Sequence, residues 1–202
     1  MKNLLMLLAA TVLGANNASA AFHLWDIQEV YSNADGTVQY VEFFTSSNGQ
    51  EFLSGHTLAS TGATTLTFPA SLPLNSPLAG HPNTASSTGN QTFLVATSNF
   101  TALYNVVPDY ILPAGFLQSG SGKLLNFNSG TDTVNLTSLP IGGTQSLNAD
   151  IADANPASFT INSIGSPKNF RGETALVPEP TTVALAAAGC VLLFSRRKRS
   201  RS

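Results

Sequence analysis

The sequence has few charged residues and little positive charge outside its two ends. Only 10% of its 202 residues are charged and 43% are hydrophobic, a composition typical of one globular domain and not of a charge-rich disordered chain. Between Ala21 and Leu176, six Asp and four Glu face only Lys123, Lys168 and Arg171, a net charge of −7. An acidic body of this kind is unsuited to a phosphate backbone, which excludes nucleic acid as a partner.

Cysteine is nearly absent as well. Cys190 is the only one, and it lies in an apolar run near the C-terminus, so disulfides, zinc–thiolate sites and cysteine nucleophiles are excluded from the body. The three histidines, His23, His56 and His81, show no metal-binding spacing, and we find neither a serine nucleophile elbow nor a glycine-rich phosphate loop. We therefore predict no metal, no other cofactor and no catalytic residue.

An export signal is indicated at the N-terminus. Lys2 precedes the uncharged apolar run Leu4–Gly14, and Ala18–Ala20 supplies the small residues that signal peptidase requires. We predict a signal peptide over residues 1–20, with cleavage between Ala20 and Ala21. The apolar run is shorter than the roughly 20 residues that a membrane-spanning helix needs, which argues against a retained anchor.

A second signal is indicated at the C-terminus, over residues 177–202. The motif Val177, Pro178, Glu179 and Pro180 precedes an uncharged run from Thr181 to Phe194. The basic residues that follow are Arg196, Arg197, Lys198, Arg199 and Arg201. Positive charge beside an apolar helix resists translocation, so we predict a single transmembrane helix with its tail in the cytoplasm and the body outside. The run would span about 21 Å of a ~30 Å hydrocarbon core, which suits a temporary handle better than a permanent anchor.

These three parts, in this order at the end of the chain, resemble the PEP-CTERM sorting signal of Gram-negative bacteria. The resemblance implies that an exosortase, a membrane enzyme, recognises the Pro-Glu-Pro motif and processes the protein near it. The inner membrane would then be an intermediate location, and the cell surface or exopolymer matrix the destination. A plain tail anchor, which would keep the C-terminus, is the alternative.

The body shows the pattern of an all-β domain over residues 21–176. Short β-rich runs recur between clusters of Gly, Asn, Ser and Pro, and no long window has helical spacing. The predicted strands are Leu24–Ser32, Thr37–Thr45, Thr64–Phe68, Thr92–Thr97, Lys123–Phe127, Thr133–Leu136 and Ser158–Ile161. A helical turn is predicted at Asn99–Tyr104 and a long surface loop at Pro69–Asn90.

The hairpin of the first two predicted strands carries the most specific site hypothesis. Asp35-Gly36 favours a two-residue turn, which fixes the register. The resulting pairs are Tyr31 with Tyr40, Glu29 with Glu42 and Ile27 with Phe44. Opposed carboxylates repel, so Glu29 and Glu42 would need a bridging cation, a shared proton or hydrogen-bond donors. In the interpretation that we prefer, a slip or bulge separates them and each accepts hydrogen bonds from loop amides.

The same register places four aromatic side chains on one sheet face, namely Trp25, Tyr31, Tyr40 and Phe44. Aromatic residues at period two are what the interior of a sandwich requires, so we expect this face to be core and not a sugar-stacking platform. The nearby Asn33, Asp35 and Gly36 form only a fragment of a calcium loop, and we expect them to make a turn.

Six short motifs of the body occur in the order found in one known family. They are Ile27–Val30 with Asn33, Tyr40–Phe43, Leu53–Leu58, Leu112–Gly115, Asp132–Val134, and Ser166–Pro167 with Asn169. In this order they resemble the lamin-tail domain family, with His56 where Trp is usual. The resemblance implies an immunoglobulin-like β-sandwich that is used for binding or display, with no catalytic residues to carry over.

The sequence thus predicts an exported, non-enzymatic protein of the bacterial surface or exopolymer matrix. It would act in adhesion, or by binding a polysaccharide or another surface protein, after processing by signal peptidase and exosortase. The alternative is a secreted polysaccharide hydrolase in which Glu29 and Glu42 serve as acid and base. Paired strand residues can meet the separation of about 5–9.5 Å found between glycosidase carboxyl groups, but the sequence shows no cleft.

Overall fold

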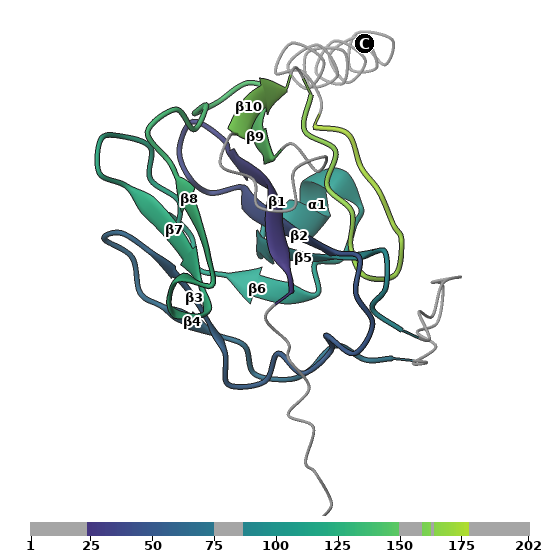
Figure 1. Ribbon diagram of the computed structural model, residues 1–202. Coiled ribbons are helices and arrows are strands. Elements are labelled where there is room, and N and C mark those ends of the chain that lie inside the picture. The colour runs from purple at the N-terminus through teal and green to yellow at the C-terminus, as the bar shows by residue number, and fades with distance from the viewer. Residues whose placement is uncertain (1–23, 75–86, 150–158, 163, 178–202) are drawn as a thin grey trace, which may run out of the picture.

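The computed structural model describes residues 24–74, 87–149, 159–162 and 164–177 (Figure 1). These residues form two β-sheets with almost no helix, which confirms the all-β prediction. The predicted signal peptide and its cleavage site, the residues Pro178–Pro180, the predicted transmembrane helix and the basic tail lie outside the described residues. Within the described ranges, no helix is long and apolar enough to cross a membrane.

The larger sheet has six strands and the smaller has four. The elements in chain order are β1 (Asp26–Ser32), β2 (Gln39–Thr45), β3 (Thr57–Ser60), β4 (Leu66–Thr67), β5 (Gln91–Thr97), α1 (Phe100–Tyr104), β6 (Tyr110–Leu112), β7 (Leu124–Phe127), the 3-10 turn η1 (Asn128–Gly130), β8 (Asp132–Asn135), β9 (Ser146–Ala149) and β10 (Phe159–Asn162). The strand orders are β10-β9-β1-β2-β5-β6 and β4-β3-β7-β8. In these sheets β5 and β6 are parallel, and the other pairs are antiparallel.

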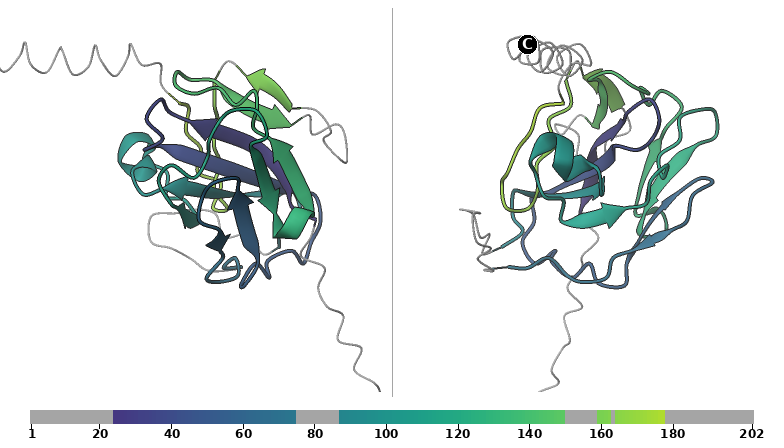
Figure 2. Two further views of the ribbon diagram at one scale, coloured as in Figure 1. Left: turned by 90° about the vertical axis from the view of Figure 1, so that its left-hand side faces the viewer. Right: turned by 180° about the vertical axis from the view of Figure 1, so that it is seen from behind.

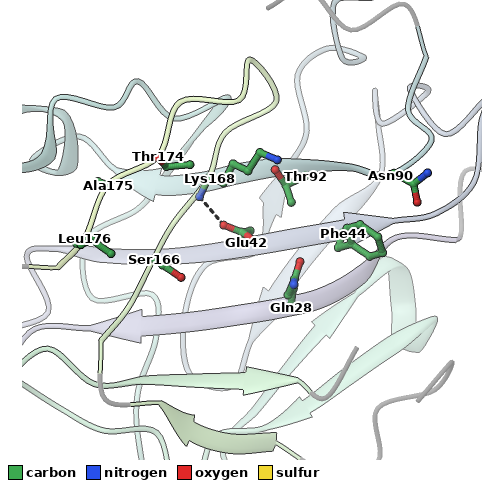
Figure 3. A pocket seen from close by; sticks show the side chains of 10 residues that line it. All are labelled: Gln28, Glu42, Phe44, Asn90, Thr92, Ser166, Lys168, Thr174, Ala175 and Leu176. Atoms are coloured by element: carbon green, nitrogen blue, oxygen red, sulfur yellow. Dashed lines mark hydrogen bonds between the residues drawn. The ribbon is translucent and has the colours of Figure 1, made fainter. Parts of the chain in front are cut away.

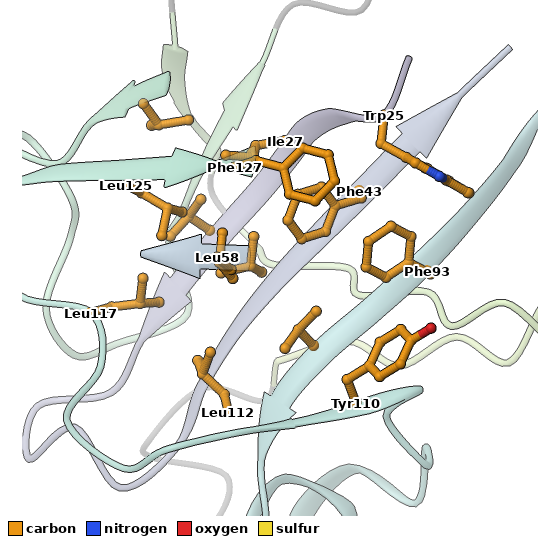
Figure 4. Packing of buried hydrophobic residues seen from close by; sticks show 14 of the residues in the cluster. Trp25, Ile27, Phe43, Leu58, Phe93, Tyr110, Leu112, Leu117, Leu125 and Phe127 are labelled. Carbon is orange, nitrogen blue, oxygen red and sulfur yellow. The ribbon is translucent and has the colours of Figure 1, made fainter. Parts of the chain in front are cut away.

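The main core lies between the two sheets and is rich in aromatic rings (Figure 4). Phe43 of β2 stacks on Phe93 of β5 with ring centroids 4.4 Å apart, and Trp25 meets Phe93 edge-on at 4.7 Å. From the smaller sheet, Phe127 of β7 approaches Phe43 to 5.0 Å. Because large aromatic side chains bury much apolar area, this cluster makes a large contribution to stability.

The outer face of the larger sheet, which points away from the smaller sheet, is covered too. Tyr31 and Tyr40 stack there at 5.3 Å, and Tyr40 meets Phe100 of α1 at 5.6 Å. Leu94 and Val177 complete this second apolar cluster with neighbouring side chains. Because both faces of β1, β2 and β5 are covered, almost every residue of these strands is buried.

The β1–β2 register is confirmed in part. Tyr31 pairs with Tyr40 and Glu29 with Glu42, as the hairpin pattern predicts. A β-bulge between Ile27 and Glu29 then shifts the register, so the predicted pairing of Ile27 with Phe44 is wrong and Ile27 pairs with Phe43.

The bulge also corrects the predicted aromatic face. The extra residue, Gln28, changes the side to which the first part of β1 points, because successive strand residues alternate between faces. Trp25 therefore lies in the main core, whereas Tyr31 and Tyr40 belong to the second cluster on the outer face. Phe44 lies on that outer face and is only half-buried.

The turn between β1 and β2 is wider than predicted. Asn33 N donates to Val38 O at 2.9 Å, so four residues form the loop, and only Gly36 among them has a positive φ, +70°. Side chains hold it: the Asp35 carboxylate accepts hydrogen bonds from the backbone amide and hydroxyl of Thr37. A four-residue loop centred on the same position keeps the same strand register, which is why the pairing of the glutamates is still correct.

Three strands are absent from the prediction, namely β3, β6 and β9. Each has only three or four residues, too few for a period of two to stand out from the surrounding turns. The predicted strand Thr64–Phe68 contains only the two-residue β4, whereas the predicted helical turn is confirmed as α1.

Candidate functional site

Residues 164–177 form a hairpin, which we call the strap, on the outer face of the larger sheet beside α1 (Figure 2). Its two arms are joined by backbone hydrogen bonds from Asn169 to Glu173, from Ala175 to Pro167 and from Val177 to Gly165, all 3.0–3.1 Å long. The far end turns at 170–172, and Asn169, which is fully buried, holds the turn by accepting hydrogen bonds from the amides of Arg171 and Glu173. The strap is therefore an ordered part of the fold.

Three carboxylates hold the first arm of the strap to the sheet. Ser166 N donates to Glu29 Oε1 at 3.0 Å, Lys168 N to Glu42 Oε2 at 2.5 Å and Phe170 N to Asp109 Oδ2 at 2.8 Å. The donors are alternate residues, as expected for an extended chain whose amides point alternately to opposite sides. Pro167, which has no amide hydrogen, stands at a position where no carboxylate needs one.

Glu29 is satisfied by the protein itself. Its side chain is 2% exposed, and Oε1 also accepts hydrogen bonds from Ser146 Oγ at 2.5 Å and Asn148 Nδ2 at 3.4 Å. Its neighbour, the buried Tyr40 hydroxyl, makes no hydrogen bond of normal geometry with the described residues. Burial raises the pKa of Tyr40 well above its usual value, and the Glu29 carboxylate raises it further.

The Glu42 carboxyl has a raised pKa. It is 5% exposed, and burial raises its pKa from 4.5 to about 8, with repulsion from Glu29 adding to the rise. The amide and the positive charge of Lys168 act in the opposite direction. Burial and the neighbouring Glu29 therefore favour the protonated, neutral form of Glu42.

The structure shows how the two paired glutamates are accommodated. The bulge lies before Glu29, so the preferred expectation that a slip or bulge separates the glutamates is wrong, and they stand opposed. The expectation that each accepts hydrogen bonds from loop amides is confirmed. In the part of the chain that the structure describes, no group of three or more His, Cys, Asp or Glu side chains is placed to hold a metal ion.

Asp109 is the third carboxylate that binds the strap, and the sequence does not predict it. It precedes β6, and its carboxylate accepts hydrogen bonds from the amides of Leu94 and Phe170, both at 2.8 Å. Burial raises its pKa to about 6, although these two amides act to lower it. Nothing in the local sequence distinguishes it from a surface aspartate, because its partners are distant along the chain.

An open groove of about 560 Å³ lies between the strap and the strands β1, β2 and β5 (Figure 3). The lining residues are Gln28, Glu42, Phe44, Asn90, Thr92, Ser166, Lys168, Thr174, Ala175 and Leu176. Glu42 is thus shared between the strap contact and the groove, whereas Glu29 does not line it. In Figure 3 the dashed line marks the hydrogen bond between Lys168 and Glu42.

Of the predicted sorting motif, only Val177 is described. It is 2% exposed, packs into the second apolar cluster, and donates its amide hydrogen to Gly165 O at 3.0 Å. The first residue of the predicted motif is therefore part of the fold.

No protein-family model, curated protein or solved structure matches the chain. The resemblances to the PEP-CTERM signal and to the lamin-tail family therefore stay predictions from the sequence.

Proposed function

We propose that the protein is an exported, non-enzymatic β-sandwich of the bacterial surface or exopolymer matrix that acts in adhesion or in binding a polysaccharide or partner protein. In this proposal, signal peptidase removes residues 1–20, the body crosses the inner membrane, and an exosortase acts near Val177–Pro180. The sandwich would be immunoglobulin-like, as the lamin-tail resemblance implies.

The main support for the proposal is the attachment of the strap to the sheet at the C-terminal end of the body. The strap leads directly into the sorting motif, and its amides are bound by Glu29, Glu42 and Asp109. A body that is held in this way up to Val177 is suited to being passed on as a folded unit when the following segment is processed. Residues from separate lamin-tail-like motifs, Glu29, Glu42 and Ser166 among them, meet at this point.

The geometry favours this proposal over the hydrolase alternative. A glycosidase needs both carboxyl groups at an open cleft, whereas Glu29 is covered by the strap and accepts hydrogen bonds from Ser166, Ser146 and Asn148. Only Glu42 lines the groove. The variants Glu29→Gln and Glu42→Gln discriminate between the two: a hydrolase would lose turnover of polysaccharide while keeping its melting temperature, and a strap contact would change the melting temperature.

Cell fractionation with intact-mass analysis tests the proposed destination. The full chain is expressed in an exosortase-positive strain and in a strain that lacks the exosortase, and each fraction is weighed. We expect loss of both terminal segments, and release from the inner membrane, only in the first strain. A C-terminus that is retained in both strains would make the protein tail-anchored and would overturn the matrix assignment.

A further inference from the structure

The groove beside Glu42 contains a buried polar group that the fold itself does not satisfy. Gln28, the extra residue of the β1 bulge, lines it, and its buried Oε1 has no hydrogen-bond partner among the described residues. A buried acceptor without a partner costs about 1–3 kcal/mol and calls for an explanation. In Figure 3 the carboxamide of Gln28 is directed toward β2, between Glu42 and Phe44.

The other lining groups offer both apolar and polar contacts. Phe44 is half-buried and provides an aromatic surface, while Thr92, Thr174 and Asn90 contribute hydroxyl and amide groups. Asn90 stands at a φ of +57°, a conformation that asparagine tolerates better than most residues. A volume of about 560 Å³ is within the range of small-molecule sites, which have mostly apolar walls and a few polar groups that fix orientation.

The charge of the groove favours a ligand without net charge. Among the described residues that line it, Glu42 and Lys168 are the only ionisable side chains, and the raised pKa of Glu42 favours its neutral form. An anion would add to the repulsion from Glu29 that already raises the pKa of Glu42, and a cation would meet the Lys168 ammonium. A neutral ligand with several hydroxyls can instead donate to one group and accept from the other, because hydroxyls do both.

From this combination we infer that the groove binds a neutral saccharide, with one apolar C–H face of a sugar ring against Phe44 and ring hydroxyls bonded to Glu42, Gln28 and Thr92. The terminal torsion of a glutamine is soft, so a small rotation lets the Gln28 oxygen accept a sugar hydroxyl. The inference deepens the proposed function and rests on it, because it names the ligand class and the site for a protein displayed among polysaccharides.

Amide chemical-shift mapping by NMR tests the inference on the full chain, held in a zwitterionic detergent that contains no sugar. The probes are D-glucose, D-galactose, D-mannose and N-acetyl-D-glucosamine. D-glucuronate serves as the anionic comparator, and glycerol as a polyol without a ring. We expect saturable shifts at groove residues with at least one neutral sugar and none with glycerol.

Two variants and a matched control make the test specific. Phe44→Ala should weaken binding by about tenfold or more, whereas Phe52→Ala, which truncates a 51% exposed phenylalanine outside the groove, should leave it unchanged. Gln28→Met should also weaken binding by about tenfold without lowering the melting temperature, because it removes an unsatisfied acceptor and keeps the side-chain length. If Gln28 had only a structural role, Gln28→Met would lower the melting temperature and leave sugar binding unchanged.

Three results would overturn the inference. They are the absence of saturable groove shifts with every neutral sugar, a preference for glucuronate over glucose, and binding that survives both Phe44→Ala and Gln28→Met. These failures are distinct from failure of the proposed function, because fractionation reports the destination independently of ligand binding. A protein that reaches the surface with a silent groove would refute the saccharide site alone.

Discussion

The two faces of the six-stranded sheet are covered in different ways. On the inner face, Phe43 and Phe93 pack against the smaller sheet in an apolar core. On the outer face, α1 covers the tyrosines while Glu29 and Glu42 bind the amides of the strap. The inner contact depends on apolar area, which many residue combinations can supply. The outer contact also depends on hydrogen bonds to the individual carboxylates of Glu29, Glu42 and Asp109, for which few other residues can substitute.

The largest effect should come from the inner face. Phe43→Ala removes a fully buried ring that contacts both Phe93 and Phe127, and we expect a loss of about 3–5 kcal/mol in the free energy of unfolding. Urea denaturation measures it, with Phe52→Ala as the control for an exposed ring. A loss no larger than that of the control would mean that the main core does not lie between the sheets.

On the outer face, Glu29→Leu should cost about 3 kcal/mol in the free energy of unfolding. The substitution leaves the Ser166 amide and the Ser146 hydroxyl without their acceptor. Amide hydrogen exchange should accelerate in the strap before the β1–β2 strands are affected. Glu51→Leu is the control, since no strap amide bonds to Glu51, and equal exchange in both variants would contradict the role of Glu29.

Gly165→Ala should cost about 2 kcal/mol through overpacking. A methyl group at Gly165 would overlap the Tyr40 hydroxyl and come to 2.9 Å from Val177 Cγ2. Tyr40→Phe removes one of these clashes at little cost, because the hydroxyl makes no normal hydrogen bond with the described residues. The double variant should therefore recover part of the loss in a thermodynamic cycle, whereas strictly additive effects would show that the two sites do not touch.

The smallest effect concerns pH. The pKa of Glu42 is raised from 4.5 to about 8 and that of Asp109 from 3.8 to about 6, so the folded protein binds these protons more tightly than the unfolded chain. The stability they contribute is fully present below about pH 4 and is lost as the pH rises through these folded values. Glu42→Gln should flatten the curve between about pH 5 and 8 and leave the variant more stable than the parent above pH 8, because a glutamine cannot ionise. Melting temperatures across this range check the prediction, and a parent protein whose stability rises with pH would contradict it.

The parts of the molecule that the sequence predicts correctly are local. Asp35 and Gly36 mark the turn, and the alternation on each side of it is enough to oppose Glu29 and Glu42. The bulge at Gln28 is not predictable in this way, because it depends on which residues the main core accepts on both sides of it. That single insertion places Trp25 inside the sandwich and directs Gln28 toward the groove.

The strap is the part that the sequence could not predict. The backbone amides of its first arm donate to side-chain carboxylates and not to the backbone of a neighbouring strand. The arm also lacks the alternating hydrophobic pattern by which a strand is predicted from sequence. Asp109 and Phe170 are 61 residues apart in the sequence, and only the folded sheet, in which β6 pairs with β5, brings them together. A buried carboxylate that bonds to a distant amide has the same local sequence as one on the surface.

The arrangement of the strap also determines how the body responds to force applied at its C-terminal end. The bonds from Val177 to Gly165, from Ala175 to Pro167 and from Asn169 to Glu173 succeed one another along the hairpin. A force applied to the chain beyond residue 177 therefore acts on these hydrogen bonds one at a time, beginning with the bond from Val177 to Gly165. The second arm would peel away at low tension, and the strands β1 and β2, which lie further along the load path, would stay paired.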